Sequence, residues 1–534
     1  SRVLIIGDFD VDGATATALF MRGFGLLGYP NDKVSFLVPN RFEFAYGLSH
    51  ELVEEAKKWQ QHLLINDDNG IANHDGVAAA KQYGWDVIIT DHHLPRETLP
   101  NADVIVNPNC VDNDFPSKNL AGVGVAFYVL LALKKTLQAQ GWFDQFNQKA
   151  LPNLTQLLDL VALGTVADVV PLDRNNRILV EHGLKQIRQQ QSCVGIQALF
   201  EVAGKNFQQA VASDLSFACA PRLNAAGRLD DITVGIHCLL TDDFNQARMY
   251  AKQLNDYNQE RKIIEATMKD QALNTLAQLD QTLQANQQAL PPILCLYDES
   301  WHQGVVGILA SRIKEQYHRP CIIFANSNET AESPTQNELE QPSSVQIKGS
   351  ARSVEGIHIR DLLAEINRRY PDLIPMFGGH AMAAGLTLDR VDFSRFKQIL
   401  EAVAQAYCHE DCLTESLYTD GALHAEELTL KVAEMLRYAA PWGQHFPEPL
   451  FDGHFIIQRK TVLKEKHLRL ELSPVSDTAS NKPPNNTNRV QGIIFNTDVT
   501  QWPSEQAQVH LLYQFDVNEF RGHRSPQLMI KKRL

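Results

Sequence analysis

Five short apolar runs in the first 110 residues are separated by helix-length stretches, and together they indicate the fold class. The runs are rich in β-branched residues and lack polar alternation, and they cover Val3–Ile6, Val34–Val38, Leu63–Ile65, Val87–Thr90 and Val104–Val106. Such runs are typical of strands that are buried on both faces of a parallel sheet. We therefore predict an α/β domain with a parallel sheet, followed by mostly helical chain over residues 121–200.

A long amphipathic helix is predicted after this domain. Between Asp242 and Leu283, apolar residues recur at helical spacing among polar ones, without Gly or Pro, and we expect this helix to link two domains. A second α/β pattern follows, with strands expected at Ile293–Tyr297 and Cys321–Ala325 and a helix over Gly304–Gln316. Residues 326–346 are strongly polar, and we expect a disordered surface insertion there.

The C-terminal part has the pattern of a small β-barrel of the OB type. Runs with strand character, separated by turn-rich stretches, cover Phe455–Ile457, His467–Leu472, Val490–Phe495, Val509–Phe515 and Gln527–Lys531. The chain is therefore divided into residues 1–200 with the parallel sheet, 201–285 with the long helix, 286–410 with the second α/β domain, and 411–534 with a connector and the barrel.

Composition favours an ordinary globular protein, with 44% hydrophobic and 21% charged residues. No apolar run approaches the ~20 residues that cross a bilayer, and no signal peptide is recognisable, so we expect a cytoplasmic protein with no membrane partner. The first residue is not Met, and we expect the natural N-terminus to lie further upstream. The eight cysteines are interpreted as reduced thiols. Cys408 and Cys412 are read as two neighbouring helical cysteines, since no second pair completes a zinc site.

The net charge of −14 disfavours a nucleic-acid partner, because phosphate binding depends on Lys and Arg. The distribution weakens that argument. Residues 451–534 hold 12 Lys and Arg against 8 Asp and Glu, which leaves the excess of acidic residues in the first 450. The acidic part is where carboxylates cluster, and the basic excess lies in the barrel.

Acidic side chains follow three of the predicted strands. Asp8, Asp10 and Asp12 come after the first strand, Asp68 after the third, and Asp91, His92 and His93 after the fourth. Ligands of open α/β sheets bind beyond the carboxyl ends of the strands, so these side chains should converge. Carboxylates this close repel one another unless a cation neutralises them, which favours Mg²⁺ or Mn²⁺, with imidazole shifting the preference toward Mn²⁺. A calcium-type loop or a simple acidic turn is the alternative.

Asp168 is a further candidate ligand, in a small-residue turn after an apolar helix. Asp159, earlier in that helix, is its rival. A charge that only stabilises a helix terminus is the alternative for either residue.

At this point the residues resemble a known family. The motifs GDFDVDGATA, DNGI, DHH, GTVADVVPL, APRLNAAGRL and GGHAMAAG occur in the order found in the DHH phosphoesterase superfamily with a DHHA1 domain. Together with the barrel, they resemble the bacterial members that degrade single-stranded DNA from the 5′ end. The resemblance extends over nearly all 534 residues.

The resemblance implies two divalent cations, Mn²⁺ or Mg²⁺, held by Asp8, Asp10, Asp12, Asp68, His92 and Asp168. Asp68 would bridge the two ions, His93 would face the scissile phosphate, and Asp91 would support the histidines. Two such cations lower the pKa of a water and stabilise the leaving oxygen of an in-line displacement. No Ser or Cys in these motifs has the adjacent base that a covalent nucleophile needs.

Other residues must select the substrate. Gly378 and Gly379 have no Cβ, so the backbone beside His380 can approach a phosphate closely. The alternative for this segment is a tight turn at the start of a helix, with His380 in solvent. A Gly-containing turn offers Arg222, Asn224 and Arg228 to phosphate, with structural salt bridges as the alternative. The resemblance adds a pocket for the 5′-terminal phosphate, made by Arg41, Ser350 and Arg352, and Tyr46 as an aromatic near the entrance. In the barrel the candidates are Arg459, Lys460, Lys464, Lys466, Arg469, Arg521, Phe455, Tyr513 and Phe520, of which most aromatics are expected in the core.

The leading interpretation, implied by the resemblance, is a nuclease that releases nucleotides from the 5′ end of single-stranded DNA in DNA repair and recombination. Single-stranded DNA is the expected partner, with a single-strand-binding protein and a helicase as candidates, and the protein is expected to be a monomer. A phosphodiesterase acting on short oligoribonucleotides or cyclic dinucleotides is the alternative enzyme, although such small substrates need no barrel. A scaffold that has lost its metal ligands is a third class, and the complete acidic and histidine set disfavours it.

Overall fold

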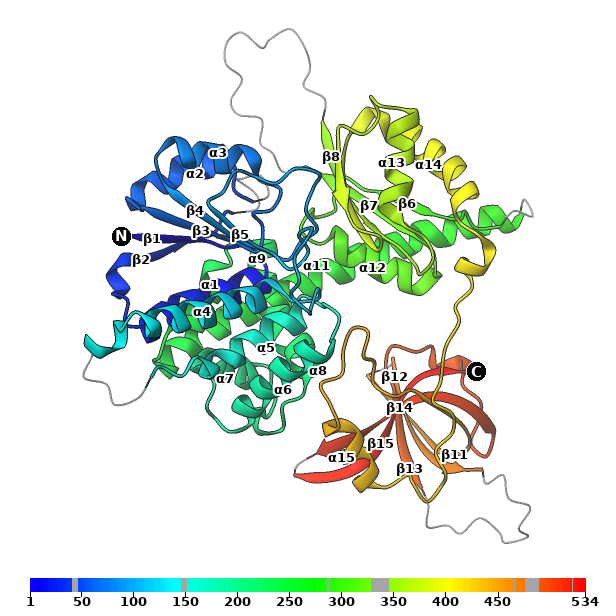
Figure 1. The fold of residues 1–534 in the computed structure, drawn as a ribbon. Helices are drawn as coiled ribbons and strands as arrows, with labels where there is room; N and C mark the ends of the chain where they lie inside the picture. The colour runs from blue at the N-terminus through cyan, green and yellow to red at the C-terminus, as the bar shows by residue number, and fades with distance from the viewer. Residues whose placement is uncertain are drawn as a thin grey trace.

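The N-terminal domain of this computed structural model is built on a five-stranded parallel sheet with strand order β2-β1-β3-β4-β5 (Figure 1). The structure describes residues 1–40, 47–145, 151–285, 289–327, 345–464, 466–475, 489–520 and 522–534. The strands of this sheet are β1 (Val3–Ile6), β2 (Val34–Leu37), β3 (Leu63–Asp67), β4 (Asp86–Thr90) and β5 (Val104–Val106). All five lie where the apolar runs predict them, and the parallel sheet is confirmed.

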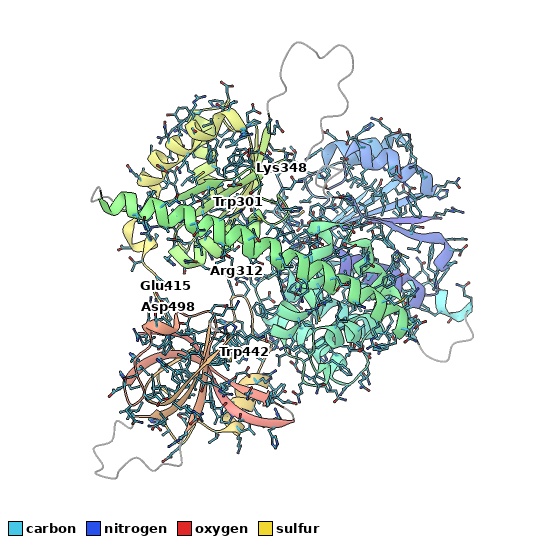
Figure 2. All side chains as sticks on the ribbon, turned by 180° about the vertical axis from the view of Figure 1, so that it is seen from behind. Trp301, Arg312, Lys348, Glu415, Trp442 and Asp498 are labelled. Carbon is cyan, nitrogen blue, oxygen red and sulfur yellow. The ribbon has the colours of Figure 1, made fainter. Side chains whose placement is uncertain are left out.

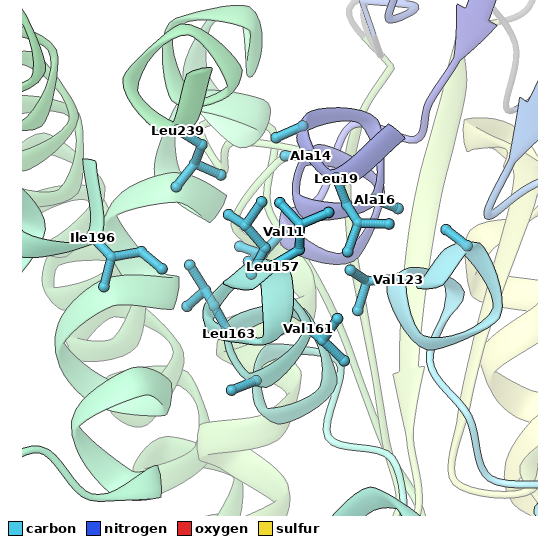
Figure 3. Packing of buried hydrophobic residues seen from close by; sticks show 14 of the residues in the cluster. Val11, Ala14, Ala16, Leu19, Val123, Leu157, Val161, Leu163, Ile196 and Leu239 are labelled. Atoms are coloured by element: carbon cyan, nitrogen blue, oxygen red, sulfur yellow. The ribbon is translucent and has the colours of Figure 1, made fainter. Parts of the chain in front are cut away.

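Helices cover both faces of this sheet, which explains why its strands are apolar on both sides. The helices next to the sheet are α1 (Val11–Leu26), α2 (His50–Ala56), α3 (His74–Gln82) and α4 (Gly122–Ala139). The remaining helices of the domain pack mainly on other helices: α5 (Leu158–Ala167), α6 (Arg174–Arg188), α7 (Val194–Val202), α8 (Ala212–Asp214), α9 (Ala220–Leu229) and α10 (Thr233–Leu240). One face packs on α2 and α3. On the other face α1 lies in the larger core, where Val11 and Leu19 are near Leu157 and Val161 (Figure 3).

By length and apolar composition α4 would suffice to cross a membrane. In the fold, however, α4 packs against α1 and α5, and most of its N-terminal half is buried in the larger core. The apolar character of α4 is thus explained by its place inside the domain, as expected for a core helix.

The long helix α11 (Phe244–Ala285) confirms the predicted linker and belongs to two cores. Its first part buries Ala247, Ala251 and Leu254 in the core of the N-terminal domain. Its second part buries Met268 and Leu276 against the second α/β domain. Sharing one rigid helix fixes the two domains relative to each other (Figure 1).

The second α/β domain has a mixed sheet with strand order β6-β7-β8-β10-β9. Its elements are β6 (Leu294–Tyr297), α12 (Val306–Tyr317), β7 (Cys321–Asn326), β8 (Gln346–Arg352), α13 (Ile359–Arg369), β9 (Met376–Gly379), β10 (Ala383–Asp389) and α14 (Phe393–Tyr407). Strands β7 and β8 pair antiparallel, so the predicted insertion connects two neighbouring strands. Its ends belong to those strands, and residues 328–344 lie outside the described chain.

The two clustered cysteines do not share a helix, contrary to the prediction. Cys408 directly follows α14, and Cys412 lies in a separate short helical turn, Glu410–Leu413. Both thiols are free and pack against the core of the second α/β domain. The prediction relied on helical spacing alone, and the sequence offered no signal for the break between them.

The C-terminal part is a closed five-stranded barrel with order β11-β12-β13-β15-β14, which confirms the predicted barrel. Its elements are α15 (Leu430–Tyr438), β11 (Phe451–Leu463), β12 (His467–Pro474), β13 (Val490–Ile494), β14 (Gln508–Phe520) and β15 (His523–Arg533). Strands β11, β14 and β15 are much longer than predicted, because their ends alternate with polar residues and lack a continuous apolar run. The boundaries drawn between the parts of the chain stay predictions.

Candidate metal centre and phosphate pocket

The end of β1 brings three aspartates together at the start of α1. Asp10 caps this helix, since its carboxylate accepts a hydrogen bond from the Gly13 amide at 3.1 Å. Asp8 and Asp12 are buried on either side of the cap. A Cβ on Gly13 would lie 2.5 Å from the backbone nitrogen of Asp8, so only glycine allows the turn to fold back this closely.

The neighbouring strand β3 delivers Asp68. Its backbone is left-handed, with φ of 65°, and its amide donates to the carbonyl of Thr90 at the end of β4 at 2.8 Å. The start of α4 packs directly on this carboxylate, because a Cβ on Gly122 would lie 2.7 Å from Asp68 Oδ1. The same helix start holds Asp12, whose two oxygens accept from the amides of Gly122 and Val123 at 2.6 and 2.9 Å.

The expected ligands converge at this edge of the sheet. His92 Nε2 lies 3.2 Å from Asp68 Oδ1, 3.6 Å from Asp168 Oδ2 and 3.8 Å from Asp12 Oδ2. Ligand atoms fall within 4.8 Å of one another in three overlapping groups: Asp68 with His92 and His93, Asp12 with His92 and Asp168, and Asp8 with Asp10 and Asp68. Asp68 and His92 each belong to two of these groups. All six residues expected to hold metal therefore lie in one cluster.

The electrostatics of the cluster favour a bound cation. Burial, with repulsion from Asp10, raises the pKa of Asp12 to about 7. Burial and the surrounding carboxylates also raise the pKa of Asp68 and of Asp168. Asp68 Oδ1 and His92 Nε2 are buried without a hydrogen-bond partner in the described chain. Divalent cations would neutralise the repulsion and supply the missing partners, so the residues fit the metal pair.

The two histidines differ in protonation. Burial, with repulsion from His93, lowers the pKa of His92 to about 4, which keeps its imidazole in the neutral form that binds metals. Burial opposes protonation of His93 as well, but the hydrogen bond of 2.8 Å to Asp91 raises its pKa to about 9. The Asp91 carboxylate also accepts hydrogen bonds from the backbone amides of His92, His93 and Ile71. Its contacts fit the supporting role expected for it.

The two candidate aspartates of α5 lie in different places. Asp168 ends the helix inside the acidic cluster. Asp159 is buried elsewhere, where its carboxylate accepts hydrogen bonds from the Leu160 and Cys193 amides at 2.8 and 2.7 Å. Asp159 therefore serves the packing of α5 against α7, and Asp168 is the better candidate ligand.

We expect Asp168→Asn to lower the rate of metal-dependent hydrolysis of single-stranded DNA by about 10²-fold or more. The reason is that the substitution takes one anionic oxygen from the cluster. Asp159→Asn should leave the specific activity of the folded protein within about 2-fold and should lower the melting temperature instead, because one of two buried amides loses its acceptor. Initial rates with Mn²⁺ and thermal melts of both variants check this. Equal loss of activity in the two variants would contradict the assignment.

Two of the three predicted 5′-phosphate residues, Ser350 and Arg352, line a cavity of about 270 Å³ whose wall also includes Phe9 from the acidic cluster. Ser350 and Arg352 line it from β8, and the Arg352 guanidinium donates to Ser350 Oγ at 3.1 Å. Phe9, between two of the clustered aspartates, forms part of the same wall. The fold thus brings Ser350 and Arg352 next to the candidate metal centre from a domain that follows all of its ligands in the chain.

Lys348 and Gln303 also line this cavity, and the sequence analysis did not name them. Figure 2 shows Lys348 on the part of the second α/β domain that faces the N-terminal domain. A signal for Lys348 was present, because alternate residues of a strand share one face, and Lys348, Ser350 and Arg352 are alternate residues of β8. Gln303 gave no comparable signal.

The motif that was expected to form a Gly-containing turn is the helix α9, so this prediction was wrong. Its Pro lies at the helix start, where proline is compatible with the backbone. Arg222 is buried and donates to Asn255 Oδ1 and to the Ala218 carbonyl, at 3.1 and 2.5 Å. These bonds favour the structural alternative for Arg222. Asn224 and Arg228 line cavities and stay candidates for phosphate contact.

His380 reaches the metal centre from the second α/β domain. Gly378 and Gly379 end strand β9, and His380 begins the turn into β10, so the alternative of a helix-start turn is wrong. The His380 ring stacks on His93 with 6.4 Å between centroids. The space beside Gly378 is open, since a Cβ there would meet no atom within 4 Å. Arg41 and Tyr46 lie outside the described residues.

The barrel candidates divide by burial. Phe455 and Tyr513 are buried in the barrel core, as expected for most of its aromatics. Phe520 is exposed, and the Lys460 ammonium donates to the carbonyls of Trp502 and Pro503. Arg521 lies outside the described residues.

Comparison with known proteins matches the three folded parts separately. The sequence matches the DHH family, N-terminal domain, over residues 2–165, the DHHA1 domain over residues 290–407, and the RecJ OB domain over residues 419–532.

Similar proteins extend over almost the whole chain. The "Single-stranded-DNA-specific exonuclease RecJ" of Salmonella typhimurium is 49% identical over 99% of this chain and 87% of that protein. The protein of the same name from Haemophilus influenzae is 46% identical over the same shares. Among solved structures, RecJ from Thermus thermophilus in complex with Mn²⁺ superposes with a TM-score of 0.75 and 29% identity, and covers 99% of this chain and 69% of that one.

Proposed function

The chain belongs to the RecJ family of DHH phosphoesterases, and from this premise we propose that it hydrolyses single-stranded DNA from the 5′ end and releases nucleotides. The observation that carries the proposal is the convergence of His92 with Asp12, Asp68 and Asp168 within 3.8 Å at the edge of the sheet. Asp68 Oδ1 and His92 Nε2 have no hydrogen-bond partner in the described chain, and burial with the surrounding carboxylates raises the pKa of Asp68, so the cluster fits bound cations.

Six residues of the cluster would hold two divalent cations, Mn²⁺ or Mg²⁺: Asp8, Asp10, Asp12, Asp68, His92 and Asp168. When bound, the cations supply a water of lowered pKa and stabilise the leaving oxygen. Asp68 would be shared between the two cations, since its carboxylate offers two oxygens and it lies within ligand distance both of Asp8 and Asp10 and of His92. Asp91 orients the two histidines through three hydrogen bonds, from both of their amides and from the His93 ring, and the Ile71 amide donates a fourth that holds Asp91 in place.

His93 and His380 bind the scissile phosphate from opposite sides of the domain interface. The raised pKa of His93 keeps a positive charge beside the cluster at neutral pH. The His380 imidazole stacks near it, next to the open backbone of Gly378, where a phosphate oxygen can approach closely. Both groups stabilise the charge that builds up on phosphate oxygens in the transition state.

Direction along the strand follows from the cavity around Ser350 and Arg352. A terminal phosphate carries more charge than an internal diester, and the guanidinium fork matches its oxygens. Arg228 and Lys348 line the same cavity and add positive charge, and Arg41 is proposed to join them. A strand end held here places its first diester at the metal centre, which accounts for exonuclease action.

We assign the preference for single strands to the barrel and to the space between the barrel and the two α/β domains. An OB barrel combines basic residues with exposed aromatics to follow one strand. We assign Arg459, Lys464, Lys466 and Arg469 to this surface, with Tyr46 near the entrance. The protein is proposed to act as a cytoplasmic monomer in DNA repair and recombination, with a single-strand-binding protein and a helicase as partners.

The proposal is tested with 5′- and 3′-labelled single strands, duplex DNA, RNA and cyclic dinucleotides, each with Mn²⁺ or Mg²⁺. We expect labelled mononucleotide to appear first from the 5′-labelled single strand, and no product after chelation by EDTA. Preferential cleavage of the dinucleotides or of short RNA would replace the proposal with the phosphodiesterase alternative. Equal cleavage from both strand ends would contradict the assigned polarity.

A further inference from the structure

A cleft of about 500 Å³ lies where the N-terminal domain, α11 and the barrel meet. Val169 and Phe217 line it from the N-terminal domain, Arg261 from α11, and Trp442 and Gln514 from the C-terminal part. Figure 2 shows Trp442 on the side of the barrel that faces the helices of the N-terminal domain. The backbone of Leu172 donates to the carbonyl of Gln444 at 2.8 Å, so the two sides of the cleft are joined.

Phe217 stands out on this cleft because 81% of its surface is exposed. It lies in a π-helical turn, Leu215–Cys219, inserted between α8 and α9. Its neighbours Leu215 and Cys219 are fully buried, so the turn anchors itself in the core and projects the phenyl ring outward. π-helical turns in longer helices are rare and frequently mark functional positions. An exposed large aromatic on a cleft wall suggests that something planar packs on it.

The residues on both sides of the candidate ligand Asp168, Ala167 and Val169, line the cleft. Its wall includes Val169, which follows the candidate ligand Asp168 and is 61% exposed with a left-handed φ of 60°. Such a backbone is unfavourable for a β-branched residue and is retained where the surroundings impose it. Thr165, one turn before Asp168, also lines the cleft, and its buried hydroxyl has no hydrogen-bond partner in the described chain.

The cleft and the 5′-phosphate cavity share one lining residue, Arg228. Arg228 and Arg261 are the basic residues of the cleft lining, and Glu448 is its carboxylate. Burial, with repulsion from Asp516, raises the pKa of Glu448. Arg261 is paired with Glu265 at 2.7 Å, and Arg228 donates to the carbonyl of Gly304. The guanidinium groups on this wall can contact phosphates, and the exposed ring of Phe217 can pack on a base, a combination that fits a nucleic-acid strand.

We propose that Phe217 stacks on a base of the single-stranded substrate, on the part of the strand that has not yet reached the metal centre. The inference rests on the proposed function, since it assumes the same substrate. A phenyl ring accepts any base, so the contact positions the strand without selecting its sequence. Phe217 is thus a positioning residue, and hydrolysis itself does not need its side chain.

The test compares Phe217→Ala, Phe217→Trp and the control Val391→Ala, which removes a side chain that is 80% exposed in the second α/β domain. The substrates are 5′-phosphorylated oligothymidylate of 20 nucleotides and the dinucleotide pTpT. We expect Phe217→Ala to raise KM for the long strand about 10-fold, the size of one lost stack, with kcat nearly unchanged. Phe217→Trp should restore KM, and pTpT, too short to span both sites, should be cleaved equally by all variants.

A series of strands with one abasic nucleotide at successive positions locates the stacked base. In the wild type, an abasic nucleotide at one particular position should raise KM for the strand. The same abasic nucleotide should not raise KM any further in Phe217→Ala. An unchanged KM for Phe217→Ala on the long strand, or an equal loss on pTpT, would overturn the inference while the proposed function stands. If the wild type cleaves pTpT but not the long strand, the proposed function fails, and this inference fails with it.

Discussion

Replacing Asp68 with Asn is expected to lower the rate of single-stranded DNA hydrolysis at saturating Mn²⁺ by at least about 10³-fold. This is one of the two largest effects that we expect. The reason is its place between two ligand groups, where one carboxylate faces both Asp8 and Asp10 on one side and His92 on the other. An amide of the same shape cannot supply negative charge to two cations. Initial rates at several Mn²⁺ concentrations measure the loss.

The control for this variant is Asp75→Asn, which changes an exposed carboxylate near the start of α3. It should retain the wild-type rate within about 2-fold, as surface substitutions usually do. Asp68→Asn should also be at least as stable as the wild type without metal, because it removes a buried carboxylate whose pKa is raised by burial and by its neighbours. A folded Asp68→Asn variant that keeps the wild-type rate with Mn²⁺ would contradict the assignment.

Replacing Arg352 with Ala removes the advantage of a 5′-phosphorylated strand. Hydrogen bonds to a charged group contribute about 1.5–3 kcal/mol, so kcat/KM for the phosphorylated strand should fall about 10- to 100-fold. A strand with a 5′-hydroxyl should be cleaved by wild type and variant at similar rates. Competition between the two strands in one reaction measures the ratio directly.

Arg395→Ala, an exposed arginine of α14, is the matched control and should keep the wild-type preference. Arg352→Lys separates charge from shape. Lysine keeps the positive charge but lacks the planar donor fork that also holds Ser350 Oγ, so it should restore only part of the preference. An unchanged preference in Arg352→Ala would show that the terminal phosphate is bound elsewhere.

The sequence predicted the fold well where periodicity carried the information. The parallel strands have continuous apolar runs, and the long helix has helical spacing without Gly or Pro, so both could be located from the pattern. The metal cluster followed from the same reasoning, because the carboxyl ends of β1, β3 and β4 meet at one edge. Asp68 and His92 could therefore be placed together although they are distant in the chain.

The remaining differences have tertiary causes. The residues around Arg222 resemble a turn in composition, but packing against α11 keeps them helical, with the guanidinium bonded to Asn255. Asp159 and Asp168 belong to one helix, and only the packing of α5 decides which of them faces the metal centre. The exposure of Phe217 depends on a π-helical turn and on the position of the barrel, neither of which has a local signal.

The most direct measurement is anomalous diffraction from crystals of the protein soaked in Mn²⁺. We predict two manganese peaks about 4 Å apart at the carboxyl edge of the first sheet, both within bonding distance of Asp68, with His92 and Asp168 among the other ligands. The same crystals of Asp68→Asn should lose at least one peak. A single peak in the wild type, or peaks that Asp68 does not touch, would contradict a two-metal centre built on these residues.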